Sequence, residues 1–102
     1  MNLLIDKHRD DLLTLCRRFH VSRLELFGSA TGPGFNAASS DLDFLVEFLD
    51  IPPEARADAY FELLEALQGL FDRSVDLVEI GAIRNPYFQV AVDKTRTLLY
   101  AA

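Results

Sequence analysis

The chain has 102 residues and a mass of 11.5 kDa, which is enough for one compact domain over residues 1–102 and too little for two. Apolar residues make up 50% of the chain and charged residues 25%, a globular balance that excludes a disordered protein. The net charge is −6 and both halves are acidic, which excludes bulk nucleic acid as a partner but is compatible with a metal-bridged nucleotide.

Three further features predict a cytoplasmic protein. No apolar run is long enough to span a membrane. Charged residues crowd the start of the chain, where a secretory signal would have a basic stub and an apolar core. The single cysteine, Cys16, excludes an intrachain disulfide and a multi-cysteine zinc site, and it suits a reducing compartment.

The first half of the chain predicts a helix, a strand and a shaped loop. Residues 3–19 have apolar side chains at helical spacing, which indicates an amphipathic helix that faces a core: Ile5, Leu12, Leu15, Cys16 and Phe19. Val21 to Phe27 alternates like a strand and ends at Gly28-Ser29. From there to Ser40 lie three of the five glycines, so we expect a loop with room for one short helical turn.

Asp41 to Phe48 is the clearest strand, with Leu42, Phe44, Val46 and Phe48 on one face and Asp41, Asp43, Leu45 and Glu47 on the other. Pro52-Pro53 then opens a helix over about residues 54–68.

A third strand is predicted at Ser74 to Ile80, and Asn85-Pro86 begins a last helix through about residue 95. Leu98 to Tyr100 is expected as a short packed tail. The predicted order, α-β-loop-β-α-β-α, gives an α+β (α/β-like) domain with a small mixed sheet covered by helices.

The acidic residues on the predicted strands are unusual, because aspartate is depleted in strands. Asp41 and Asp43 are two residues apart and project from the same face, with their Cβ atoms roughly 6–7 Å apart. If the strand that carries Asp76 is a neighbour, three carboxylates converge and repel one another. A divalent cation such as Mg²⁺ or Mn²⁺ would remove that conflict. The alternative is that Asp41 caps the strand and Asp43 lies on a solvated face.

The Gly28-Ser29 turn leads into the acidic strand and could hold phosphate. Glycine lets the backbone approach a ligand closely, consecutive amides can bind phosphate oxygens, and Ser29 adds a hydroxyl. The alternative is an ordinary tight turn. Ser40, just before the acids, is expected to orient the turn.

Together these residues resemble a known family. Leu26-Phe27-Gly28-Ser29, then Ser40-Asp41-Leu42-Asp43, then Val75-Asp76-Leu77-Val78 are similar to the motifs of the minimal nucleotidyltransferase (MNT) family of the DNA polymerase beta superfamily. The resemblance implies a polymerase-beta-like fold and the transfer of a nucleoside monophosphate from a nucleoside triphosphate, such as ATP, to an acceptor hydroxyl. It also implies a helical HEPN-type toxin as partner in a toxin–antitoxin pair, where some members add AMP to a tyrosine of the toxin.

The resemblance also implies roles for single residues. Asp41 and Asp43 would hold two Mg²⁺ ions, Asp76 would ligate the second ion and receive the acceptor proton, and Gly28 and Ser29 would hold the β- and γ-phosphates. One departure is that many members carry an arginine just after the Gly-Ser pair, whereas Ala30-Thr31-Gly32 follows here.

Three functions stay open from the sequence. The first is a Mg²⁺-dependent adenylyltransferase that acts on a partner protein, in a hetero-oligomer with it. The second is an antitoxin that neutralises its toxin by binding alone, which the absent arginine favours. The third, transfer to a small molecule, is disfavoured because 102 residues leave no room for an acceptor domain.

The remaining candidates have ordinary structural explanations. His8 and His20 suit surface or capping roles, and Cys16 suits a buried apolar position. Tyr60 and Phe61 belong to a helix core or its rim. Tyr87 and Phe88 are either core residues or part of a partner-binding surface.

Overall fold

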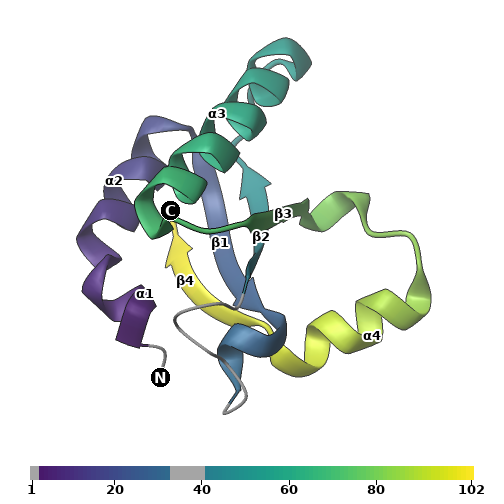
Figure 1. The fold of residues 1–102 in the computed structure, drawn as a ribbon. Coiled ribbons are helices and arrows are strands. Elements are labelled where there is room, and N and C mark those ends of the chain that lie inside the picture. The colour runs from purple at the N-terminus through teal and green to yellow at the C-terminus, as the bar shows by residue number, and fades with distance from the viewer. Residues whose placement is uncertain (1–2, 33–40) are drawn as a thin grey trace.

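The structure is a computed structural model that describes residues 3–32 and 41–102 (Figure 1). Its centre is a four-stranded mixed sheet with the strand order β3-β2-β1-β4, which confirms the predicted mixed sheet. β1 pairs antiparallel with β2 and β4, whereas β2 and β3 are parallel. The strands are β1 (Val21–Phe27), β2 (Leu42–Phe48), β3 (Val75–Glu79) and β4 (Thr97–Ala101).

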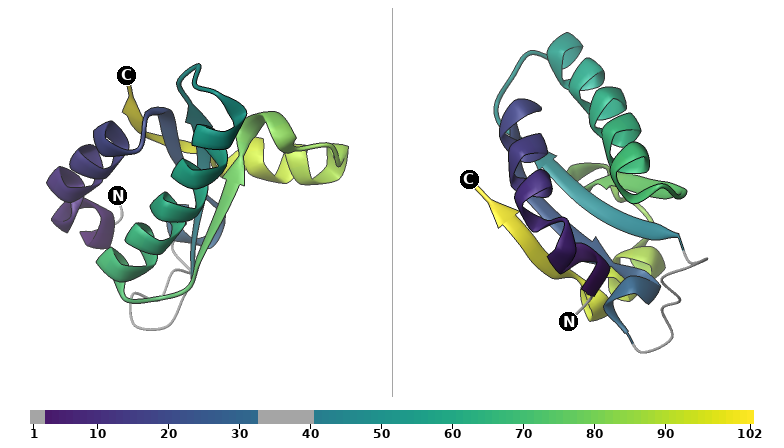
Figure 2. Two further views of the ribbon diagram at one scale, coloured as in Figure 1. Left: turned by 90° about the horizontal axis from the view of Figure 1, so that it is seen from above. Right: turned by 60° about the vertical axis from the view of Figure 1, so that its left-hand side comes forward.

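Helices lie on both faces of the sheet (Figure 2). One face is covered by α1 (Leu3–Lys7), α2 (Arg9–Arg18) and α3 (Pro53–Phe71). The other face carries α4 (Pro86–Thr95), and two short 3-10 turns, η1 (Gly28–Thr31) and η2 (Ile80–Ala82), follow β1 and β3. No helix in the two described ranges has both the length and the hydropathy that a membrane span would need.

The alternation of β2 divides the apolar side chains between two cores. Leu42, Phe44 and Val46 point to one face and are fully buried beneath α1, α2 and α3. Leu45 points to the other face, where it packs with Phe27 and with Val92 of α4. Asp43 lies two residues before Leu45 on the same strand, so its side chain points to the same face of the sheet. The acidic face predicted from the sequence is therefore the face that carries α4.

Two segments differ from the sequence expectation. The helix expected over residues 3–19 is broken at His8, whose ring lies edge-on to that of Phe71 with 5.2 Å between the ring centroids. The expected tail at Leu98 to Tyr100 is the edge strand β4. Its backbone pairs with the outer edge of β1, which satisfies donors and acceptors that would otherwise lack strand partners.

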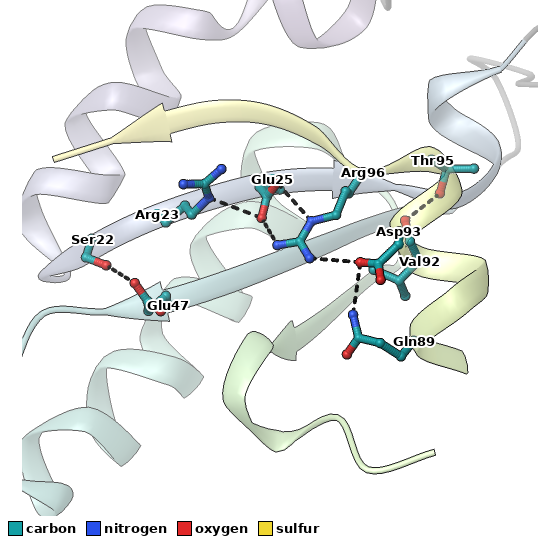
Figure 3. A network of polar contacts seen from close by, with 9 residues as sticks. All are labelled: Ser22, Arg23, Glu25, Glu47, Gln89, Val92, Asp93, Thr95 and Arg96. Carbon is teal, nitrogen blue, oxygen red and sulfur yellow. Dashed lines mark hydrogen bonds and ion pairs between the residues drawn. The ribbon is translucent and has the colours of Figure 1, made fainter. Parts of the chain in front are cut away.

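A buried ion pair anchors the end of α4 to the middle of the sheet (Figure 3). Glu25 of β1 is only 3% exposed, and Arg96, the residue after α4, donates to it from Nε over 3.1 Å. Arg23 lies 3.3 Å from the same carboxylate, and Asp93 accepts from Arg96 over 3.0 Å. The hydrogen bond and charge of Arg96 hold the pKa of Glu25 below its usual value against the opposing effect of burial.

At the other end of α4, the side chain of Asn85 accepts hydrogen bonds from two backbone amides, as the Asn85-Pro86 pair predicted.

Candidate functional site

Two carboxylates lie side by side on neighbouring strands. Asp43 of β2 and Asp76 of β3 are register partners in the parallel pair, so their side chains project from the same face at the same level. Asp43 is half-buried and Asp76 is exposed. Burial first, then the hydrogen bond to Asp76 and the charges of Asp76 and Asp41, raise the pKa of Asp43 to about 6. Without a cation, the Asp43 carboxyl therefore keeps its proton to a higher pH than an ordinary aspartate does.

The turn after β1 lies directly against Asp43. Gly28 has a φ of +76°, and a Cβ placed on it would be 2.6 Å from Oδ2 of Asp43. Only glycine fits both the backbone conformation and the close approach. The backbone amide of Gly28 donates to the hydroxyl of Thr95 over 2.9 Å, and Thr31 donates to the carbonyl of Gly28 over 2.8 Å. Ser29 is exposed beside this turn.

The third acid stands apart from the pair. Asp41 is exposed and lies one residue before β2 begins at Leu42, although its charge is felt at Asp43. Within residues 3–32 and 41–102, no three acidic, histidine or cysteine side chains are close enough together to hold a metal ion. Of the three carboxylates expected to converge, the structure brings Asp43 and Asp76 together in register, and Asp41 does not form a cluster of three with them. Ser40 lies outside the described residues.

A cavity of about 380 Å³ opens beside the two carboxylates. Phe27 and Phe88 form part of its wall, with their rings edge-on and their centroids 6.0 Å apart. Tyr60 of α3 lines it from another side and donates its hydroxyl to the carbonyl of Leu77. The cavity therefore combines two acidic groups with aromatic walls, which suits a ligand that has both a charged and a ring portion.

The residues present fit a divalent cation. Carboxylate oxygens are the ligands that Mg²⁺ and Mn²⁺ prefer. The charge of Asp76 contributes to the raised pKa of Asp43, and a cation beside the two carboxylates would offset that repulsion. Glycine at position 28 keeps the space next to Oδ2 of Asp43 free of a side chain.

The other titratable candidates do not join this site. Cys16 is fully buried, and burial raises the pKa of its thiol to about 12, so it is an inert core residue as predicted. His8 packs against Phe71, and His20 is exposed in the turn before β1 with a φ of 61°. Tyr87 is 86% exposed, while its neighbour Phe88 forms part of the cavity wall.

Sequence reasoning missed Thr95, which contacts the site through Gly28. The two residues are 67 positions apart, and a threonine in the last turn of a helix has no local pattern that marks it. Only the packing of α4 against the end of β1 brings them together.

Comparison with known proteins gives a family match over most of the chain. The family model described as "Nucleotidyltransferase domain" matches residues 5–99. A relative from Methanocaldococcus jannaschii, named "Putative protein adenylyltransferase", is 35% identical over 80 residues, which are 78% of this chain and 78% of that protein.

Solved structures show the same fold. A structure titled "Structure of putative minimal nucleotidyltransferase" superposes with a TM-score of 0.64 at 28% identity, covering 95% of both chains. A complex of a tri-AMPylated Shewanella oneidensis HEPN toxin with an MNT antitoxin matches with a TM-score of 0.59 at 22% identity, covering 95% of this chain and 72% of that chain.

Proposed function

Because the chain belongs to the nucleotidyltransferase family, as a minimal member with the polymerase-beta-like fold, we propose that it transfers AMP from ATP to a hydroxyl of a partner protein. The observation that carries this proposal is the pair of register-matched carboxylates, Asp43 and Asp76, directly beside the Gly28 turn. We propose a HEPN-type helical toxin as the partner, with this chain as its antitoxin in the cytoplasm. The relative named for protein adenylylation and the MNT–HEPN complex support this choice.

Asp41 and Asp43 would hold two Mg²⁺ ions, and Asp76 would ligate the second of them, which are the roles that the sequence predicted. When bound, two Mg²⁺ ions would supply positive charge for the triphosphate and for the attacking and leaving oxygens. Burial and the neighbouring carboxylates raise the pKa of Asp43, and a bound cation would offset the repulsion among these acids once Asp43 has lost its proton.

The chain's own residues would orient the reactants. Ser29 and the amides of the turn would bind the β- and γ-phosphates. Since the Gly28 amide already donates to Thr95, the contribution of Gly28 would be room for close approach. Asp76 is exposed and lines the cavity, where it would accept the proton of the acceptor hydroxyl. Ser40 keeps its proposed role in orienting the turn.

Apolar side chains on the outer surface of α4 support a protein partner. Tyr87 is 86% exposed and Val90 is 54% exposed, and both lie on α4. Exposed apolar side chains gathered on one element are typical of interaction surfaces. The same helix carries Phe88, which lines the cavity beside Asp43 and Asp76.

A second function, neutralisation of a toxin by binding alone, is favoured by one observation. Thr31 stands where many members carry an arginine, and its hydroxyl bonds to the carbonyl of Gly28. The side chain at this position therefore stabilises the turn and supplies no positive charge to the triphosphate.

The acidic pair can be tested by calorimetry. Replacement Asp43→Ala should reduce the affinity for ATP with Mg²⁺ by at least about tenfold, because it removes one of the two paired carboxylates. The matched change Asp50→Ala removes an exposed acid beyond the far end of β2 and should leave the affinity unchanged. Equal affinity in the wild type and Asp43→Ala would contradict the proposed site.

A further inference from the structure

A side-chain hydroxyl from a distant helix contacts the Gly28 turn. Oγ1 of Thr95 accepts the Gly28 amide proton over 2.9 Å, and the two groups are partly buried. The same turn lies against Asp43, since any Cβ on Gly28 would collide with Oδ2 of that residue. The position of the turn therefore sets the space on one side of the Asp43 carboxylate.

The direction of the Thr95 hydroxyl is fixed by its other partners. As a donor it faces backbone carbonyls of its own helix, 3.4 Å away at Val92 and 3.5 Å away at Ala91. Its proton is thus used within α4, which leaves a lone pair for the Gly28 amide. A side chain of the same shape without oxygen, such as valine, would leave the amide without this acceptor.

The residues before and after Thr95 in the sequence hold this end of α4 against the sheet (Figure 3). Arg96, the next residue, is bound to the buried carboxylate of Glu25, which lies three residues before Gly28 on the same strand. Val92, one turn earlier, is 1% exposed and packs against Phe27. Thr95 is therefore fixed relative to the strand from which the turn emerges.

We propose that Thr95 is a positioning residue, whose hydroxyl holds the Gly28 amide and thereby fixes the Gly28-Ser29 turn against Asp43. The inference rests on the proposed function, in which this turn contacts the triphosphate. In that setting Thr95 does not touch the nucleotide. It keeps Ser29 and the following amides in the conformation that binds the phosphates, while the Gly28 amide itself is engaged.

The test compares Thr95→Val, which keeps the shape and removes the acceptor, with Thr95→Ser, which keeps the acceptor. Thr14→Val is the matched control, because Thr14 lies in α2 with its hydroxyl on the carbonyl four residues before it and is exposed. The first readout is hydrogen exchange of the Gly28 amide without metal or nucleotide. The second is the affinity for ATP with Mg²⁺.

We expect Gly28 exchange to be about tenfold faster in Thr95→Val and close to wild type in Thr95→Ser and Thr14→Val. Affinity for ATP with Mg²⁺ should fall about tenfold in Thr95→Val alone, while exchange at the core residue Leu24 stays unchanged. Unchanged Gly28 exchange in Thr95→Val would overturn the inference, and so would equal losses in the valine and serine variants. If the wild type binds no ATP, the proposed function fails, and the exchange rates alone decide whether Thr95 holds the turn.

Discussion

Replacement Asp76→Asn should slow transfer of the nucleotidyl group to the partner by on the order of a thousandfold. Asparagine keeps the size of the side chain but removes the negative charge and the group that would receive the proton of the acceptor hydroxyl. Asp76 is exposed, and its charge contributes to the raised pKa of Asp43, so the amide should also relieve repulsion within the pair and leave the fold intact.

Two comparisons separate this effect from a loss of binding or folding. The affinity of Asp76→Asn for ATP with Mg²⁺ should stay within a few fold of the wild type, because Asp76 is assigned to the acceptor side of the reaction. The control Glu79→Gln also replaces a carboxylate by an amide, three residues further along β3, at a residue that is paired with Arg56. This variant should transfer the nucleotidyl group at the wild-type rate. Equal rates for the wild type and Asp76→Asn would exclude this role for Asp76.

Replacement Arg96→Met should lower the free energy of unfolding by about 2 kcal/mol at pH 7. The change leaves the carboxylate of Glu25 buried, with Arg23 as its remaining close cation. It also frees the end of α4, so binding of ATP with Mg²⁺ should weaken together with stability. Arg17→Met, on an exposed position of α2, should change the unfolding free energy by less than about 0.5 kcal/mol.

The difference between the wild type and Arg96→Met should depend on pH. Since Arg96 lowers the pKa of Glu25 in the folded state, the resulting stabilisation is fully present above the unfolded value of 4.5 and is lost as the pH falls through the lowered folded value. Urea unfolding at pH 7 and at about pH 3 measures this directly. A difference that stays constant between the two pH values would show that the lost stability does not come from the ion pair.

Part of the arrangement of the acidic pair could be predicted from the sequence, because the face on which a strand residue lies depends on local alternation. Alternation within β2 fixes the face of Asp43, and the connection through α3 places β3 beside β2 in parallel. The sequence predicted that Asp76 lies near the other acids only if its strand is their neighbour, and the parallel register of β2 and β3 places it beside Asp43. The cap of α4 was predictable for the same reason, since Asn85 and Pro86 act within one turn of each other.

What could not be predicted depends on contacts between distant parts of the chain. The strand β4 is a five-residue segment in which Leu98 and Leu99 interrupt the alternation, and its structure comes from pairing with β1. The contacts of Glu25 with Arg96 and of Gly28 with Thr95 join residues 71 and 67 positions apart. No local pattern encodes such pairs, so only the packing of α4 reveals them.

The most direct test of the proposed reaction is to measure which phosphorus atom of ATP is transferred to the partner. The chain, co-expressed with the protein encoded beside it, should transfer label from α-³²P-ATP to that protein and none from γ-³²P-ATP. A nucleotidyl transfer breaks the bond at the α-phosphorus and releases pyrophosphate, whereas a kinase moves the γ-phosphoryl group. Label from α-³²P-ATP on a hydroxyl of the partner, lost in Asp76→Asn, is the result that the account predicts. A partner that is neutralised without any label from α-³²P-ATP would contradict it and would establish neutralisation by binding alone.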